Sequence, residues 1–205
     1  DGLDIFQDVL AYVVLLISLL LFHALFTYSI FLKFIGGLSP VTFFKKIKNV
    51  ALFAFSTSSS AATIPVTLKT VNQDLGVNQN VASFVVPVGA TINMDGTAIM
   101  QGLATVFIAQ MSGIDLTLFQ YGQVVLLAVA TSIGTAAVPS AGTITLIIIL
   151  QQFNLPLEAI GIILAVDRVL DMIRTSVNVT GDAAIACIVA KSENQLDENI
   201  FNSHK

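Results

Sequence analysis

The sequence predicts an all-α membrane protein made of transmembrane helices, two re-entrant helical hairpins and two broken helices. The first observation is composition: 55% of the 205 residues are hydrophobic and 11% are charged, whereas soluble domains carry about 25% charged residues. The mean hydropathy is correspondingly high, at +0.87. The second observation is that apolar stretches of full and half membrane length alternate with tips of small residues. Non-helical backbone is tolerated at membrane depth only where protein covers it or water reaches it, so such tips indicate re-entrant hairpins.

Residues 9–35 form the first predicted span. The stretch is interrupted only by His23, Lys33 and a few hydroxyl groups, and it is long enough to cross about 30 Å of hydrocarbon with some tilt. His23 is compatible with a proton relay, but a single histidine in an apolar helix is more often packed or directed into a cavity. A new helix is predicted next, with Ser39 as its N-cap and Pro40 as its first residue.

Residues 40–76 predict the first re-entrant hairpin. Lys45, Lys46 and Lys48 are expected in a loop, and the apolar run after them is too short to cross a bilayer. The tip is the serine-rich stretch FSTSSSAATIP, and a second short helical piece ends near Gly76. A flexible surface linker is the alternative for so many serines, but the apolar residues on both sides of the tip disfavour it.

Residues 81–112 are long enough to span the membrane, but they contain the motif NMDGT at residues 93–97. An Asp-Gly pair inside an apolar helix predicts a break that exposes a carboxylate and backbone carbonyls. At membrane depth, that combination indicates an ion-binding site. The alternative is a turn between two shorter helices, which Asn and Asp-Gly commonly form in soluble proteins.

The same order of elements then recurs. Residues 116–152 predict a second re-entrant hairpin around the tip SIGTAAVPSAG, and residues 157–191 predict a second broken span. A hairpin followed by an interrupted helix, present twice, is the internal duplication expected of an inverted-repeat transporter. Residues 192–205 are polar, and we expect them to form a disordered cytoplasmic tail.

One stretch, DRVLDMIRTSVNVTGD, places a narrow polar stripe on an otherwise apolar helix. Its ionisable and amide side chains recur at steps of three or four residues and fall within a sector of roughly 80°. They are Asp167, Asp171, Arg174, Asn178 and Asp182. A soluble amphipathic helix with its charged face in water is the alternative, and the composition of the whole chain disfavours it. The stripe therefore predicts a polar site in the protein interior.

The distribution of lysine predicts the orientation of the chain. If both hairpins return to the face from which they entered, every lysine falls on one side of the membrane: Lys33, Lys45, Lys46, Lys48, Lys69, Lys191 and Lys205. The positive-inside rule makes that side, and with it the C-terminus, cytoplasmic. The acidic opening DGLDIFQD lacks both an initiator methionine and the basic segment of a signal peptide. We therefore expect the chain to be the C-terminal part of a longer protein, here called the full-length protein.

Four ionisable residues are expected at membrane depth, where an unpaired charge is costly: Asp95, Asp171, Arg174 and Asp182. Arg174 offers a planar fork that suits a carboxylate. Asp171 on the same face suits an ammonium group, so the pair matches the two ends of a zwitterionic or acidic amino acid. Pairing of these two side chains with each other is the alternative that their spacing also allows. Asp95 and Asp182, with nearby amides and carbonyls, supply hard oxygen ligands that suit Na⁺ or a proton.

Enzyme chemistry and nucleic-acid binding are not indicated. The sequence shows no nucleophile–histidine arrangement, no phosphate-binding loop and no cluster of Cys and His. Its single cysteine, Cys187, lies among apolar residues, which is typical of a packing role. A channel is disfavoured because the polar residues converge on one site and do not line a path.

Four motifs in order, SSSAATIP, GATINMDGTA, SIGTAAVPSAG and DRVLDMIRTSVNVTGD, resemble the dicarboxylate/amino acid:cation symporter family of glutamate and aspartate transporters. The resemblance covers nearly the whole chain, from about residue 9 to residue 191. It implies a multi-pass protein of the plasma (inner) membrane that couples Na⁺ to the symport of an acidic amino acid by alternating access. It also implies that the second hairpin is the extracellular gate and that the full-length protein is a homotrimer.

Three alternatives stay open beside that implication. The coupling ion is H⁺ in the first, and the substrate is a dicarboxylate in the second. Asp171 disfavours the dicarboxylate, which lacks the ammonium group that this carboxylate would pair with. In the third, the chain is a membrane module that is inactive without its missing N-terminal helices.

The resemblance also implies roles for individual residues. Arg174 resembles the arginine that holds the substrate side-chain carboxylate, and Asp171 resembles the aspartate that holds the amino group. The rest of the implied substrate shell is Ser60, Thr97, Val138, Gly142, Thr175 and Asn178. The implied sodium ligands are Gly89, Asn93, Asn178 and Asp182 in one site, and Thr91, Ser132, Ile133 and Thr135 in a second. Asn93 and Asp95 match part of a third site, whose other ligands come from an earlier helix in this family.

Two departures from the family pattern are visible. The earlier helix that completes the third site, and the helices of the trimer scaffold, are not among these residues. Some members also carry an additional arginine beside the site, at positions that here hold Ser58 and Met172. Arg168, one turn before Asp171, is the nearest candidate for that role.

Overall fold

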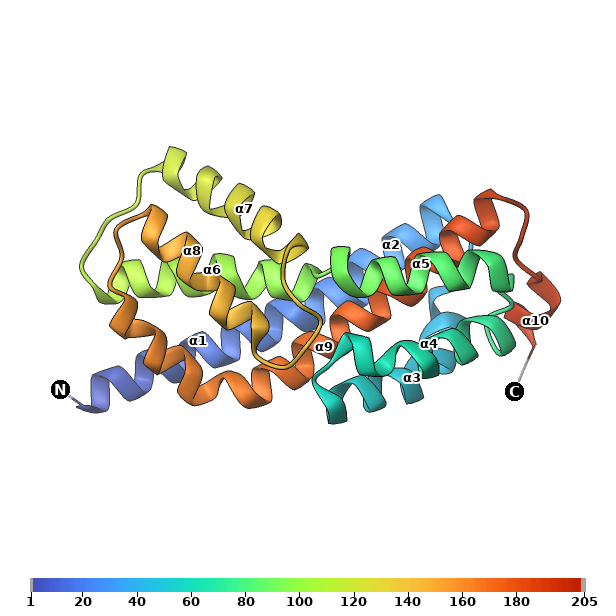
Figure 1. Cartoon of the computed structure of the whole chain (residues 1–205), viewed down its shortest axis with the longest axis horizontal. Helices are drawn as coiled ribbons and strands as arrows, with labels where there is room; N and C mark the ends of the chain where they lie inside the picture. Colours follow the sequence, from blue (N-terminus) through green and yellow to red (C-terminus); the bar gives the residue numbers. More distant parts are fainter. Residues whose placement is uncertain (1, 204–205) are drawn as a thin grey trace.

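The computed structural model describes residues 2–203, so that Asp1, His204 and Lys205 lie outside the described part. Within it, the regular elements are helices, and strand pairing is limited to one isolated bridge between Val77 and Leu196. The molecule is elongated, with the beginning of the chain at one end and its last helix at the other (Figure 1). The predicted all-α class is confirmed for these residues.

The chain begins with a long helical rod. It comprises α1 (Gly2–Phe22), the π-helical turn η1 (His23–Thr27), α2 (Tyr28–Ile30) and a second π-helical turn, η2 (Phe31–Ile35). Of the described residues, Ile5–Ile35 form the one helix long and apolar enough to cross a membrane, and 17% of its most apolar window is buried. A core helix of a soluble protein would be mostly buried, so this exposure favours contact with lipid. The two π turns were not predicted.

Helices α3 (Pro40–Thr57) and α4 (Ser60–Gln73) pack against each other and are joined by two serines. The predicted start of α3 is confirmed, because the Ser39 side chain accepts a hydrogen bond from the Thr42 backbone N–H at 3.3 Å. The expectation that the three lysines occupy a loop is wrong. They lie inside α3, where the helix continues from its capped start without a helix-breaking residue.

The predicted break in the next segment is confirmed. Helix α5 (Gln79–Ile92) and helix α6 (Asp95–Met111) are separated by two residues with non-helical backbone, Asn93 and Met94. Helix α7 (Leu118–Ile133) then starts with a capping box, and α8 (Ala141–Gln152) follows after the loop 134–140. Figure 1 shows this loop and the α3–α4 connection meeting near the middle of the molecule.

The second predicted break is wrong. After the 3₁₀ turn η3 (Leu157–Ala159), α9 runs without interruption from Ile160 to Ser192. The segment contains no proline, and its polar side chains share one face and find partners on other helices, so the backbone keeps its own helical hydrogen bonds. Helix α9 lies at the centre of the fold and contacts α1, α3, α4, α5, α6 and α8.

The expectation of a disordered tail is also wrong for residues 193–203. The Asp197 N–H donates to the Gly76 carbonyl at 2.8 Å, and the Asn78 N–H donates to the Gln195 carbonyl at 3.0 Å. A short helix, α10 (Glu198–Asn202), then buries Phe201 completely. Burial of this one aromatic side chain and the backbone bonds hold the polar segment in place.

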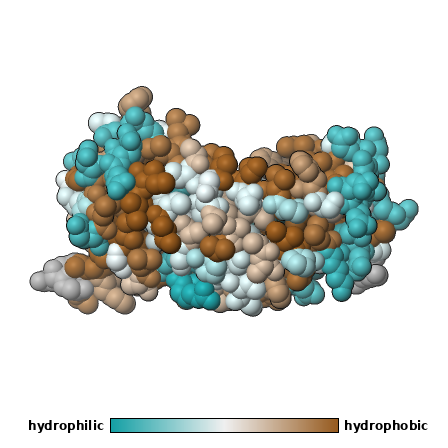
Figure 2. All heavy atoms as spheres, viewed as in Figure 1, coloured by the Kyte–Doolittle hydropathy of each residue, from teal (hydrophilic) through white to brown (hydrophobic). Residues whose placement is uncertain are grey.

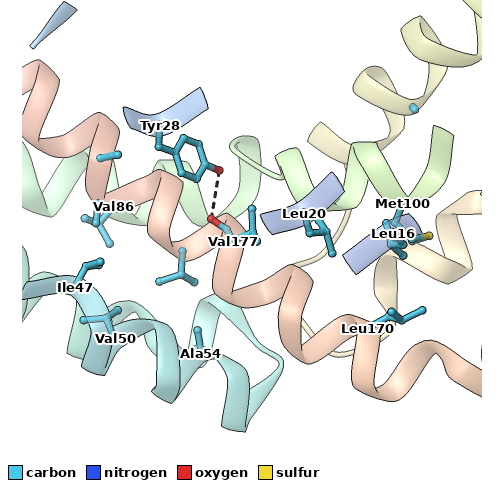
Figure 3. Close-up of a cluster of buried hydrophobic side chains, with 14 of the residues drawn as sticks. Leu16, Leu20, Tyr28, Ile47, Val50, Ala54, Val86, Met100, Leu170 and Val177 are labelled. Atoms are coloured by element: carbon cyan, nitrogen blue, oxygen red, sulfur yellow. Dashed lines mark hydrogen bonds between the residues drawn. The ribbon is translucent and has the colours of Figure 1, made fainter. Parts of the chain in front are cut away.

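The remaining surface and the core have the character expected at a membrane. Many large apolar side chains are exposed, and Figure 2 shows hydrophobic residues over much of the visible face, with hydrophilic residues gathered mostly toward the two ends. Inside, apolar side chains of α1, α3, α5, α6 and α9 pack together, among them Leu16, Val50, Val86, Met100 and Leu170 (Figure 3). This core fixes α9 between its neighbours.

Candidate functional site

The candidate site is built on the polar stripe of α9. All of its side chains are buried, with at most 5% of their surface exposed: Asp167, Asp171, Arg174, Asn178 and Asp182. Arg168 lies on the exposed side of the same helix. This candidate for an additional arginine is therefore not part of the buried stripe. Because buried charges require partners, the contacts of the stripe define what the site can do.

Arg174 is held by two carboxylates of its own helix. Its Nη2 lies 2.5 Å from Oδ1 of Asp171, and both Nη1 and Nη2 lie 3.3 Å from Oδ1 of Asp167. The Thr143 hydroxyl also donates to this Asp167 oxygen, at 2.7 Å. The alternative in which Arg174 and Asp171 pair with each other is thus the arrangement of this structure.

Asp167 is a site residue that the sequence analysis missed. It was counted in the stripe but given no role, although it precedes Arg174 by seven residues, which is two helical turns on the same face. That spacing was the available signal. Its second oxygen, Oδ2, is buried and has no hydrogen-bond partner among the described residues, so this carboxylate is held through Oδ1 alone.

Two loop tips close over the stripe. The backbone N–H of Ser140 donates to Oδ2 of Asp171 at 2.9 Å. The tips also bind each other, because the Ser59 hydroxyl and the Ala61 N–H both donate to the Ala137 carbonyl, at 2.8 and 3.3 Å. Both oxygens of Asp171 are therefore occupied by groups of the protein itself.

A small cavity remains where the stripe, the two tips and the helix break meet. All eight predicted substrate residues line it: Ser60, Thr97, Val138, Gly142, Asp171, Arg174, Thr175 and Asn178. Its volume of about 20 Å³ is enough for roughly one water molecule. The structure thus gathers the predicted residues in a closed arrangement.

The first predicted sodium set also comes together. The Asn93 side-chain N–H donates to Oδ1 of Asp182 at 3.0 Å, and the Gly96 N–H donates to Oδ1 of Asn178 at 2.8 Å. Gly89 completes this group: a Cβ atom at that position would lie 2.5 Å from Oδ1 of Asp182. Only a glycine lets the backbone and this carboxylate approach so closely. The donors are carboxylate, amide and carbonyl oxygens, which fit Na⁺.

In the described part of the chain, hydrogen bonds do not link the two segments of the second predicted sodium set as they link those of the first set. Ser132 and Thr135 are buried, whereas Thr91 and Ile133 are exposed. Among the described residues, no hydrogen bond links Thr91 to residues 132–135; its hydroxyl donates instead to the Val88 carbonyl of its own helix, at 3.0 Å.

Asp95 of the third predicted set has partners that the sequence analysis missed. Nε2 of His23 and the hydroxyl of Tyr28 each lie 3.0 Å from its Oδ2. The roles considered for His23, a proton relay or a side chain that is packed or directed into a cavity, did not name this carboxylate as a partner. The α-helical periodicity of the first span gave no signal, because residues five apart lie about 140° apart on an α-helix.

Comparison with known proteins finds similarity to one transporter family over nearly the whole chain. The sequence profile described as the sodium:dicarboxylate symporter family matches residues 1–192. An excitatory amino acid transporter of Caenorhabditis elegans is 41% identical over 189 residues, which is 92% of this chain and 38% of that protein. Excitatory amino acid transporter 2 of Homo sapiens is 46% identical over 168 residues, which is 82% of this chain and 29% of that protein. This chain therefore spans about a third of the length of such relatives.

Proposed function

The chain belongs to the sodium:dicarboxylate symporter family, and we propose that it forms the substrate-carrying part of a secondary active transporter for acidic amino acids. It is an integral membrane protein by that membership. In this proposal, the full-length protein carries glutamate or aspartate into the cell together with Na⁺ by alternating access. The matched relatives named as excitatory amino acid transporters support this substrate class. The family consists of transporters, which agrees with the expectation of a non-enzyme.

The observation that carries the proposal is the buried Arg174 at the wall of the cavity. A guanidinium that is only 2% exposed needs a carboxylate partner, and its planar fork binds one in bidentate geometry. Asp167 does not line the cavity, whereas Asp171 does. We therefore assign Asp167 to hold Arg174 in place, and Asp171 to exchange its contact with Arg174 for the ammonium group of the substrate.

The closed cavity supports a gate. An amino acid does not fit in a space for roughly one water molecule, so one of the two tips has to move. In the proposal the α7–α8 unit is the extracellular gate: its opening separates the Ser140 N–H from Asp171 and frees that carboxylate. A dicarboxylate substrate is disfavoured because it offers no positive group to Asp171.

Electrostatics supports coupling to a cation. In the described part of the chain, three carboxylates (Asp167, Asp171 and Asp182) are buried but only one guanidinium, that of Arg174. An acidic substrate adds a further negative charge. Excess negative charge at low dielectric is costly unless a cation accompanies it. Sodium fits the oxygen donors around Asp182 and Asn93, and the family name supports it. Proton coupling is the remaining candidate for the same charge balance.

The membrane arrangement also belongs to the proposal. The pairs α3–α4 and α7–α8 are re-entrant hairpins that enter from opposite faces, and the two hairpin–helix units form an inverted repeat. The lysine-bearing end, with α10 and the C-terminus, is cytoplasmic. The full-length protein is a homotrimer in the plasma (inner) membrane.

Uptake by the full-length protein in liposomes tests the proposal. Radiolabelled aspartate should accumulate when a Na⁺ gradient is imposed, and excess unlabelled glutamate should compete better than an equal excess of a dicarboxylic acid without an amino group. Accumulation driven by a pH gradient in the absence of Na⁺ would favour the proton-coupled alternative. Failure to bind any acidic amino acid would overturn the function itself.

A further inference from the structure

A π-helical turn brings two polar side chains of the first span to one place. The backbone N–H of Tyr28 donates to the carbonyl of His23, closing the five-residue turn η1. On an α-helix these two side chains would diverge by about 140°, but the wider π turn, closed by an i→i+5 hydrogen bond, brings residues five apart closer to one face. Their rings accordingly meet edge to face, with centroids 4.9 Å apart.

Both side chains converge on one oxygen of Asp95. Nε2 of His23 and the Tyr28 hydroxyl each lie 3.0 Å from Oδ2. An ionised carboxylate only accepts hydrogen bonds, so Nε2 of His23 is the donor when Asp95 carries its charge. Among the described residues, no hydrogen bond reaches the other oxygen, Oδ1, and the Asp95 side chain is 34% exposed.

Tyr28 also connects this carboxylate to α9. Its hydroxyl lies 3.3 Å from the carbonyl oxygen of Val177, the residue before Asn178 of the site. Figure 3 shows the ring of Tyr28 directed at this carbonyl from the first span. The side chain is only 1% exposed. It therefore contacts the first residue of α6 and the backbone of α9 beside Asn178 at the same time.

We propose that Tyr28 and His23 are positioning residues for a cation site at Asp95: they fix its Oδ2 and leave Oδ1 for the transported cation. This inference rests on the proposed function and extends it to two residues of the first span. A carboxylate held by two donors cannot rotate away when a cation approaches, so binding costs less conformational entropy. The contact of Tyr28 with the Val177 carbonyl couples the orientation of the Asp95 carboxylate to the polar stripe of α9.

The test is sodium-dependent aspartate binding to the full-length protein with Tyr28→Phe. The substitution keeps the ring and removes the hydroxyl, and we expect the half-saturating Na⁺ concentration to rise about tenfold, as for one lost hydrogen bond to a charged group. Aspartate affinity at saturating Na⁺ should change less than twofold. The control is Tyr12→Phe on the same rod: Tyr12 is also buried, but its hydroxyl has no partner among the described residues, so sodium dependence should not change.

Variants of the second residue separate positioning from packing. His23→Leu should raise the half-saturating Na⁺ concentration in the same way. His23→Gln retains an N–H donor, so its half-saturating Na⁺ concentration should lie close to that of the unmodified protein. Unchanged sodium dependence in Tyr28→Phe overturns the inference, as does an equal loss of thermal stability and of both affinities in His23→Leu and His23→Gln. Neither of these two results would contradict the proposed function, provided that the unmodified protein still binds aspartate together with Na⁺.

Discussion

At the scale of single residues, the proposed function makes Arg174 the side chain that selects the substrate. It is buried, it is bound by Asp171 and Asp167, and it is the sole buried cationic side chain of the described part. A neutral amino acid would leave its fork without a new partner, whereas an acidic one supplies a carboxylate. In the proposed function, a preference for acidic substrates therefore depends on this one side chain, which Asp167 contacts through Oδ1.

Replacement of this arginine tests that dependence. We expect Arg174→Ala to weaken aspartate binding by more than about a hundredfold, because the substrate carboxylate is then buried without a partner at a cost of about 3–5 kcal/mol. The measurement is a binding isotherm of the full-length protein at saturating Na⁺. Arg168→Ala is the matched control: it removes an exposed arginine from the same helix and should leave affinity unchanged. Aspartate binding within a few-fold of the original in Arg174→Ala would contradict the assignment.

At the scale of elements, one buried amide ties α6 to both arms of the α7–α8 unit. Nε2 of Gln101 donates to the Gly142 carbonyl at 3.0 Å and to the Thr145 hydroxyl at 2.8 Å, and its Oε1 accepts from the Thr131 hydroxyl at 2.8 Å. Gln101 is fully buried. If this unit is the gate, its opening has to break these bonds, so they favour the closed state.

Loss of this amide should make the gate open more often. We expect Gln101→Leu to raise the rate at which a thiol reagent modifies a cysteine placed at Ala141, which is 8% exposed, by about tenfold or more, since each lost bond contributes roughly 0.5–1.5 kcal/mol. The native Cys187 is fully buried and should stay unmodified.

Thr105→Val is the control for that experiment. Thr105 is as buried as Gln101, but within residues 2–203 its hydroxyl bonds only to a carbonyl of its own helix, at 2.7 Å. Its removal should therefore leave the modification rate unchanged. Equal rates in both variants would show that the amide does not hold the gate.

At the scale of the whole molecule, residues 193–203 connect the end of α9 to the turn between α4 and α5 through hydrogen bonds. The Lys46 ammonium donates to the carbonyls of Asp74 and Ile200, at 2.8 and 2.6 Å. Phe201 in the same segment is fully buried and belongs to the apolar core. The segment thus joins parts of the chain that lie far apart in sequence, and it makes this end of the molecule one packed unit.

Truncation of the buried ring should lower the stability of the whole protein. We expect Phe201→Ala to cost about 3–5 kcal/mol of unfolding free energy and to lower the unfolding temperature of the detergent-solubilised protein by several degrees. Ile200→Ala, one residue earlier and 37% exposed, should cost much less. A melting curve of Phe201→Ala that coincides with the original would mean that the segment does not contribute to stability.

The cation and substrate sites should also act as one unit. Asn93 of the helix break binds Asp182, and Asn178 binds Gly96 on the other side of that break, so a cation held there shapes the wall of the substrate cavity. Linkage then requires Na⁺ to tighten aspartate binding and aspartate to tighten Na⁺ binding by the same factor.

The measurement is aspartate affinity at several Na⁺ concentrations, before and after Asp182→Asn. We expect the variant to lose most of the sodium dependence, because a neutral amide attracts a cation far less than a carboxylate does. Asp115→Asn, at an exposed position, is the control and should bind as the original does. An unchanged sodium dependence in Asp182→Asn would remove this residue from coupling, and an affinity governed by pH alone would favour protons.

Several features followed from the sequence itself because their causes are local or compositional. Low charge and high hydropathy set the membrane class, Ser39 and Pro40 set the start of α3, and the Asn93–Thr97 motif set the break between α5 and α6. The spacing of Asp171, Arg174 and Asn178 predicted which face of α9 is polar, and the structure buries that face. Helical periodicity fixes such faces before any tertiary contact forms.

Contacts between distant segments were decided only by the tertiary structure. Tyr28 and His23 meet Asp95 across 67 and 72 residues of sequence, and Ser59 meets Ala137 across 78. Helical periodicity describes one helix at a time. It does not specify which residue of a second helix will form a hydrogen bond with it once the two helices pack together. The same is true of α9 and the last segment: partners on other elements satisfy the polar groups, so the helix stays unbroken and the polar tail folds.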